Sequence, residues 1–159
     1  MKDKIKTKEE LALVVQSLKQ AGKKIVTTNG CFDLMHAGHA TYLSDAKKHG
    51  DVLIVGLNSD TSVKRYKGEG RPFVNEQDRA LLIASLQSVD FVTVFDEDTP
   101  VKLLETIQPH IHAKGGDYDV EKMPESETVK NGGGTLVAIP LVDGRSTTAL
   151  VRRIKGKPL

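Results

Sequence analysis

Two histidines three residues apart stand out in NGCFDLMHAGHATYL, residues 29–43. His36 and His39 flank Gly38, after a short β-branched run and before a stretch with helical character. If a helix begins here, both imidazoles lie at its N-terminal end and can face the same side. The unpaired amides and the positive dipole of a helix N-terminus attract anions, and imidazoles can donate hydrogen bonds to phosphate oxygens. The pattern therefore predicts a phosphate site that stabilises charge in a transition state.

Other interpretations of the histidine pair remain. Paired histidines can bind zinc, but the one nearby carboxylate, Asp33, gives an incomplete ligand set at best. Histidines can also be surface residues without a role, although two of them around a glycine after a buried strand argue against this. Finally, GCFDLMHAG can be a nucleotide-binding loop that does no chemistry.

Strand and helix patterns alternate along the rest of the chain. Apolar, β-branched runs predict strands at residues 24–28, 51–58, 90–95, 110–113 and 135–139. Helical spacing and capping signals predict helices at 7–19, 37–48 and 75–86, from Thr99-Pro100 onwards, at 125–130 and after Gly144. This alternation predicts an α/β fold: a Rossmann-like, doubly wound parallel sheet of about five strands with helices on both faces. We expect one domain over residues 1–159, with an N-terminal helical extension (1–22) and a core (23–154).

The composition narrows the possible partners. With 23 Lys and Arg against 21 Asp and Glu, the net charge of +2 is too balanced to predict a nucleic-acid or membrane surface. The single cysteine, Cys31, cannot form an internal disulfide. The N-terminus lacks the features of a signal peptide, and no window approaches the roughly 18 apolar residues of a membrane span. We therefore expect a cytoplasmic protein.

Ligands of doubly wound sheets bind beyond the carboxyl ends of the strands, so the loops after the strands are the place to look. These loops are TNGCFDLMHAGH, NSDTSVKRYKGEGRPF, DEDTP, KGGDYD and VDGRST. They are rich in Gly, Lys, Arg, His and Ser/Thr although the whole chain is nearly neutral, as a local phosphate site requires. The clustered hydroxyls at residues 146–148 have no base beside them in sequence. Phosphoryl chemistry here is therefore expected to be a direct in-line displacement without a covalent intermediate.

Several of these segments resemble a known family. TNGCFDLMHAGH resembles the HxGH signature of the nucleotidyltransferase superfamily, in its cytidylyltransferase-like branch, and DGRSTTALVRRI resembles the second signature of that superfamily. Between them, GLNSDTSVKRYKGEGRPF, NEQDRALLIASLQSVDFV and KGGDYD resemble heptose-1-phosphate adenylyltransferases of bacterial lipopolysaccharide-precursor synthesis. The resemblance covers residues 23–154. It implies transfer of AMP from ATP to heptose 1-phosphate, giving ADP-heptose and pyrophosphate.

The resemblance also implies roles for individual residues. The expected catalytic residues are His36, His39, Lys67 and Arg152. The expected nucleotide-binding residues are Thr28, Asn29, Gly30, Phe32, Gly38, Arg79, Gly115, Asp117, Ser146, Thr147 and Thr148. The expected sugar-phosphate-binding residues are Asp33, Asn58, Asp60, Arg65 and Arg71. Lys67 is expected in a mobile, glycine-flanked basic loop that closes on the phosphates.

Structural roles compete with several of these functional ones. Thr28 and Asn29 can cap a strand end, Phe32 can pack rather than stack, and Asp33 can anchor its loop through backbone amides. Arg79 can lie on an exposed helix face, and a basic run such as that around Lys67 can be a solvated surface.

The partners follow from the same resemblance. Mg²⁺ is expected to arrive with ATP, bound by phosphate oxygens and waters, so no protein ligand to a metal is assigned. A homodimer and an upstream heptose kinase on a separate chain are expected. The alternatives are a CTP-dependent enzyme acting on a polyol phosphate such as glycerol 3-phosphate, a non-catalytic nucleotide-binding module, and a zinc-dependent hydrolase.

Overall fold

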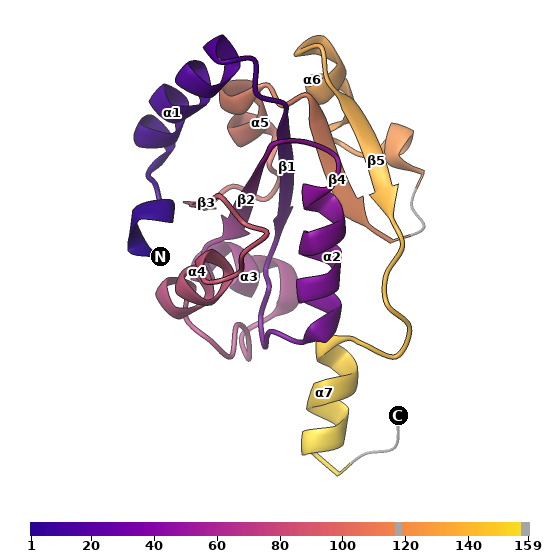
Figure 1. Cartoon of the computed structure of the whole chain (residues 1–159). Coiled ribbons are helices and arrows are strands. Elements are labelled where there is room, and N and C mark those ends of the chain that lie inside the picture. The colour runs from indigo at the N-terminus through magenta and orange to yellow at the C-terminus, as the bar shows by residue number, and fades with distance from the viewer. Residues whose placement is uncertain (117–118, 157–159) are drawn as a thin grey trace.

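A computed structural model of the chain describes residues 1–116 and 119–156 (Figure 1). Within these residues the strands β1 (Ile25–Gly30), β2 (Val52–Asn58), β3 (Phe91–Phe95), β4 (Ile111–Gly115) and β5 (Thr135–Ile139) form one sheet. Its order is β3-β2-β1-β4-β5, and all neighbouring pairs are parallel. The predicted five-stranded, doubly wound parallel sheet is thus confirmed. The strand order reverses beside β1, so the carboxyl ends of β1 and β4 form the switch point at which such sheets bind ligands.

Helices cover both faces of the sheet (Figure 1). They are α1 (Lys8–Gln20), α2 (Ala37–Lys47), α3 (Asp60–Lys67), α4 (Glu76–Ala84), α5 (Val101–Ile107), α6 (Ser126–Asn131) and α7 (Thr147–Ile154), with 3₁₀ turns at Lys2–Lys4 and Val120–Lys122. In the described residues no helix has the length and apolar character needed to span a bilayer. Figure 1 shows α2 and α7 beginning at the same edge, below the carboxyl end of β1.

The sequence of strand β2 is almost continuously apolar because both of its faces are buried. Val52 and Ile54 pack into the hydrophobic cluster that includes residues of α1 and α5, whereas Leu53, Val55 and Leu57 pack into the cluster that includes residues of α2 and α4. Successive strand side chains point to opposite faces, and both faces are covered here. A buried central strand therefore needs apolar side chains at every position.

Most predicted boundaries agree with the structure. The capping box at the start of α1 is present in both halves: Glu10 donates its backbone N–H to the Thr7 hydroxyl, and its carboxylate accepts from the Thr7 N–H. The predicted first strand continues through Asn29 and Gly30, which brings both to the switch point. Helix α5 starts one residue later than predicted, because Pro100, with ψ of 7°, is its N-cap residue instead of its first helical residue.

The basic segment after β2 was wrongly predicted to be entirely loop. Residues Asp60–Lys67 form helix α3, whose N-cap Ser59 accepts a hydrogen bond from the Ser62 N–H at 3.0 Å. Only Ser62 and Val63 of this helix are buried, so its apolar face was too narrow to give a periodic signal. The helix ends at Gly68, whose φ of +93° favours glycine. Lys67 therefore stands on the last turn of a helix.

Candidate active site

A cavity of about 710 Å³ opens at the switch point between β1 and β4. Twelve predicted site residues line it: Asn29, Gly30, Phe32, Asp33, His36, Gly38, His39, Lys67, Gly115, Ser146, Thr147 and Thr148. The others that line it are Cys31, Tyr42, Tyr66, Lys114, Met123, Leu141, Val142 and Arg145. Segments more than a hundred residues apart in sequence thus meet around one cavity.

The two histidines stack on each other at the start of α2. His36 is the N-cap residue of this helix, and the ring centroids of His36 and His39 are 3.8 Å apart with the planes inclined by 23°. The Phe32 ring packs against His39 in a T-shaped arrangement at a centroid distance of 5.4 Å. The Nδ1 atoms of both histidines are buried without a hydrogen-bond partner among the described residues. Such atoms are costly to leave unpaired, so this end of the cavity favours a polar ligand.

Both imidazoles are held in the neutral form near pH 7. Burial lowers the pKa of His39 to about 4, and His36 and Lys67 act in the same direction while Asp33 opposes them. Burial and the nearby Arg145 lower the pKa of His36. A neutral imidazole still carries one N–H donor. A bound anion beside the rings could accept hydrogen bonds from these donors and from the amides at the helix N-terminus.

Gly38 lets two segments approach each other closely. A Cβ atom at this position would lie 2.9 Å from the His36 ring and 3.0 Å from Cβ of Arg145. Arg145 belongs to the segment between β5 and α7 that carries the second signature. Only a residue without a side chain allows this segment to pack on the start of α2.

Basic side chains line the cavity near the histidines. Lys67 comes from the end of α3 and Arg145 from the segment before α7. Among the described residues neither has a carboxylate within ion-pair distance. Their charges are therefore not neutralised by these neighbours and are available to phosphate oxygens.

The hydroxyl cluster joins the second signature to the first. The Ser146 hydroxyl caps α7 by accepting from the Ala149 N–H at 3.1 Å. The Thr147 hydroxyl donates to the backbone carbonyl of Asp33 at 2.8 Å. The N-terminus of α7 is thereby held beside that of α2, and the two helix ends present unpaired amides to the same cavity.

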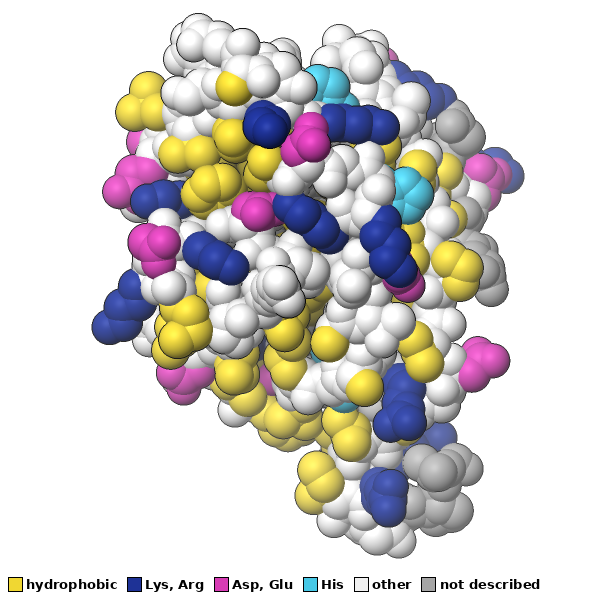
Figure 2. Space-filling view, viewed as in Figure 1, with side chains coloured by type: hydrophobic (Ala, Val, Ile, Leu, Met, Phe, Trp, Pro, Cys, Tyr) yellow, Lys and Arg dark blue, Asp and Glu magenta, His cyan; other side chains and the backbone are white. Residues whose placement is uncertain are grey.

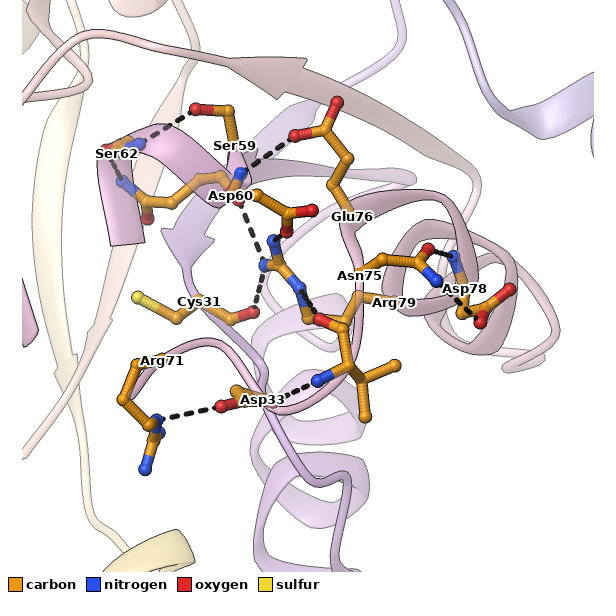
Figure 3. A network of polar contacts seen from close by, with 12 residues as sticks. Cys31, Asp33, Ser59, Asp60, Ser62, Arg71, Asn75, Glu76, Asp78 and Arg79 are labelled. Carbon is orange, nitrogen blue, oxygen red and sulfur yellow. Dashed lines mark hydrogen bonds and ion pairs between the residues drawn. The ribbon is translucent and has the colours of Figure 1, made fainter. Parts of the chain in front are cut away.

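Asp33 and Arg71 anchor a loop, and for Asp33 this is the structural role that competed with the predicted contact to sugar phosphate. The Asp33 carboxylate accepts from the backbone N–H groups of Phe73 and Val74 at 2.9 to 3.1 Å, and it lies 2.9 Å from Nε of Arg71. The Arg71 guanidinium also lies over the Phe73 ring, 4.8 Å from its centroid. These contacts occupy the carboxylate and hold the loop before α4, and Figure 3 shows the pair of Arg71 and Asp33.

Arg79, predicted as a nucleotide contact, is buried and does not line the cavity. Its guanidinium donates to the backbone carbonyls of Val74, Cys31 and Asn58 and to the Asp60 carboxylate, at 2.6 to 2.9 Å (Figure 3). These contacts also engage Asn58 and Asp60, two predicted sugar-phosphate ligands, and neither lines the cavity. The Arg79 guanidinium is buried here because backbone carbonyls at the ends of β1 and β2 need hydrogen-bond donors.

Three further residues predicted to contact ligand or to act in catalysis do not line the cavity. Arg65 pairs with Asp98 on the surface, its Nε 2.9 Å from the carboxylate. Arg152 is exposed on α7 and does not line the cavity. The buried Thr28 hydroxyl bonds the hydroxyl of Tyr42 at 2.6 Å. Asp117, another predicted contact, lies outside the described residues.

Sequence reasoning missed several polar residues of the cavity wall, among them Lys114, Arg145 and Tyr42. Lys114 stands directly before the glycines of the quoted KGGDYD segment, and its position at a strand end was an available signal. Arg145 directly precedes the hydroxyl cluster. Tyr42 gave no signal, because an apolar helix position does not reveal that its hydroxyl reaches the carbonyl of Ala113 at 3.0 Å.

Comparison with known proteins finds relatives of this chain. Residues 27–139 match the family model described as Cytidylyltransferase-like. The chain is 50% identical over 152 residues to the Bifunctional protein HldE of Geotalea uraniireducens (strain Rf4), covering 96% of this chain and 31% of that protein. It is 48% identical over 151 residues to the Bifunctional protein HldE of Aliarcobacter butzleri (strain RM4018), covering 95% and 31%. The chain thus spans about a third of the length of these curated relatives.

Two solved structures share the fold. The lipopolysaccharide core biosynthesis protein from Thermoplasma volcanium GSS1 superposes with a TM-score of 0.63 at 28% identity, over 76% of this chain and 98% of that one. The pantoate-beta-alanine ligase from Francisella tularensis superposes with a TM-score of 0.59 at 18% identity, over 98% and 70%, and shows likeness of fold alone. The family model covers most of the sheet and the histidine pair at the switch point, so the chain belongs to the cytidylyltransferase-like family.

Proposed function

We propose that this chain transfers AMP from ATP to heptose 1-phosphate, giving ADP-heptose and pyrophosphate. The resemblance of residues 23–154 to heptose-1-phosphate adenylyltransferases supports the choice of both substrates. The identity of about 50% to two proteins named HldE supports it further. The name of the Thermoplasma relative places that protein in lipopolysaccharide core synthesis, for which ADP-heptose is the proposed precursor.

The observation that carries the proposal is the stacked His36–His39 pair at the N-terminus of α2, facing a cavity into which Lys67 and Arg145 also project. An oxygen of the sugar phosphate attacks the α-phosphorus of ATP. The new P–O bond forms as the bond from the α-phosphorus to the bridging oxygen breaks, and pyrophosphate leaves with the electron pair. The imidazole N–H groups, the cations and the helix amides stabilise the negative charge on the phosphoryl oxygens.

Mg²⁺ is proposed to enter bound to the triphosphate. The carboxylate of Asp33, which lines the cavity, is already occupied by two backbone amides and Arg71. In the described part of the chain no three His, Cys, Asp or Glu side chains group as metal ligands. Phosphate oxygens and waters are proposed as the main ligands of the ion, in keeping with the chemistry of Mg²⁺.

The test is pyrophosphate release from ATP, Mg²⁺ and heptose 1-phosphate, run beside CTP and glycerol 3-phosphate. Release with the first pair alone is the expected result. Replacing His36 or His39 by glutamine should lower kcat/KM by about 100-fold, the typical effect of removing one donor to a transition-state oxyanion. His49, exposed after α2 and remote from the cavity lining, provides the matched control, and His49→Gln should leave the rate unchanged.

Other results of this pyrophosphate-release test would support a different function. Turnover of CTP with glycerol 3-phosphate would move the chain to the neighbouring branch of the family. Tight ATP binding without pyrophosphate release from any pair would favour a non-catalytic nucleotide-binding module. The homodimer, the separate upstream heptose kinase and the cytoplasmic location stay predictions that accompany this proposal.

A further inference from the structure

A chain of buried polar side chains runs from the middle of the sheet to the cavity wall. The hydroxyl of Thr27 in β1 bonds Nδ1 of His112 in β4 at 2.8 Å. Nε2 of His112 lies 3.8 Å from the Glu125 carboxylate, which lies 2.7 Å from the ammonium of Lys114. The Lys114 ammonium also donates to Oδ1 of Asn29 at 2.9 Å. This series of side-chain contacts thus ends where β1 and β4 meet at the switch point.

The two residues at the cavity end keep donors to spare. An ammonium has three N–H groups; Lys114 donates one to Asn29 and forms an ion pair with Glu125. Oδ1 of Asn29 accepts from Lys114, so the side-chain NH₂ group of Asn29 points in the other direction. This NH₂ group has no hydrogen-bond partner among the described residues. Both residues line the cavity, so their free donors are available to a ligand oxygen there.

Glu125 fixes the direction of these donors. Its side chain is only 3% exposed, yet it stays ionised: burial would raise its pKa, but the contacts with His112 and Lys114 outweigh burial and lower the pKa to about 2. Burial lowers the pKa of His112, which is therefore neutral near pH 7. The Lys114–Glu125 pair is neutral as a whole, so its effect is mainly to orient the donors.

A purely structural role explains this arrangement poorly. A buried ion pair seldom stabilises a fold more than apolar side chains of the same volume would. This pair lies on the wall of the cavity, at the point of the sheet where ligands bind, and it leaves a lysine N–H and an amide NH₂ unpaired.

We propose that Lys114 and Asn29 together bind a phosphate oxygen of the substrates, and that Glu125 is the positioning residue for this pair. The phosphate belongs to ATP or to the sugar 1-phosphate, so the inference rests on the proposed function for the identity of its ligand. Lys67 and Arg145 serve the histidine end of the cavity, whereas this pair serves the end of β1 and β4.

Equilibrium binding to Lys114→Gln tests the ligand, with Mg²⁺-ATP, adenosine and heptose 1-phosphate titrated separately by calorimetry. We expect about tenfold or greater loss of affinity for ATP or for heptose 1-phosphate, and no change for adenosine, because a charge-assisted hydrogen bond to phosphate is lost. The ligand that loses affinity identifies the source of the phosphate. Lys23→Gln, at the exposed amino end of β1, is the matched control.

These titrations need no turnover, so they remain informative if no adenylyl transfer is observed. Affinities for both phosphate ligands within twofold of the wild-type values would overturn the proposal. An equal loss for adenosine would also overturn it, because the contact would then be to base or ribose.

A double-mutant cycle tests the positioning role of Glu125. Glu125→Gln should weaken binding of the same phosphate ligand in the wild-type background and have no further effect when residue 114 is already glutamine. Equal effects in both backgrounds, or none in either, would show that Glu125 does not act through Lys114. Lys114→Gln alone leaves the buried Glu125 carboxylate unpaired, whereas the Lys114→Gln/Glu125→Gln variant does not. The double variant therefore shows whether a loss of binding in Lys114→Gln comes from misfolding.

Discussion

At the scale of single residues, the packing of His39 determines when it binds a proton. Burial, with help from His36 and Lys67, lowers its pKa from the usual 6.5 to about 4. Between pH 6.5 and about 4 the unfolded chain therefore binds more protons at this residue than the folded chain does. The contribution of His39 to stability therefore falls as the pH falls through this range.

This linkage predicts a difference between the wild-type protein and the His39→Gln variant. From pH 7 to pH 4.5 the free energy of unfolding should fall more for the wild type, because glutamine cannot bind a proton. Urea denaturation of both proteins at the two pH values measures the difference, and His49→Gln controls for loss of a histidine elsewhere. Parallel curves for the wild type and His39→Gln would contradict the assigned pKa shift.

At the scale of elements, Arg79 connects α4 to its neighbours. It donates to carbonyls that follow β1 and end β2, and it pairs with Asp60 at the start of α3 (Figure 3). These groups lie at the edge of the sheet, where the ladder no longer pairs them. One side chain thus replaces several backbone partners and fixes how α3 and α4 lie beside the cavity.

Arg79→Leu should therefore destabilise the fold. Loss of the buried donor leaves three carbonyls and a carboxylate unpaired, and we expect a fall of about 3 to 5 kcal/mol in the free energy of unfolding. Urea denaturation measures it, and Arg153→Leu on the exposed face of α7 should stay within about 0.5 kcal/mol of the wild type. Unchanged stability with lost ATP affinity would instead restore Arg79 as a nucleotide contact.

At the scale of the whole molecule, helix α7 stands apart from the layered body. Figure 1 shows it projecting beyond the sheet, and it buries none of its residues. Figure 2 shows acidic and basic side chains mixed over the body, with basic ones on the projecting end. The hydrogen bond from the Thr147 hydroxyl to the carbonyl of Asp33 and the close packing of Arg145 on Gly38 hold this end of the chain against the histidine loop.

Thr147→Val keeps the shape of the side chain and removes that hydrogen bond. We expect kcat/KM for adenylyl transfer to fall about tenfold, because the helix end that helps hold the phosphates is no longer fixed. The free energy of unfolding should change by less than about 1 kcal/mol, the net value of one hydrogen bond. Thr106→Val in α5, which loses a bond to the Lys102 carbonyl, is the control. Unchanged kcat/KM would contradict a role in assembling the site.

Patterns that are local in the sequence determined most of the fold. Strands and most helices follow from apolar runs and caps, because hydrophobic period and capping are decided within a few neighbouring residues. The place of His36 and His39 followed for the same reason: a glycine-spaced pair at a helix start after a buried strand lies at the carboxyl edge of a parallel sheet. Helix α3 was missed, since its buried face is too small to leave a period.

Only the tertiary structure decided what each polar side chain faces. Arg65 shares helix α3 with Lys67, Arg79 lies on α4 and Asp33 lies between β1 and α2. Each of Arg65, Arg79 and Asp33 is taken up by carboxylates, carbonyls or amides from other segments. Lys114 lines the cavity from the end of β4, and its ammonium contacts Glu125, the N-cap residue of α6, and Asn29 in β1. A side chain binds a ligand only if the fold leaves its donors unpaired, and that depends on partners distant in the sequence.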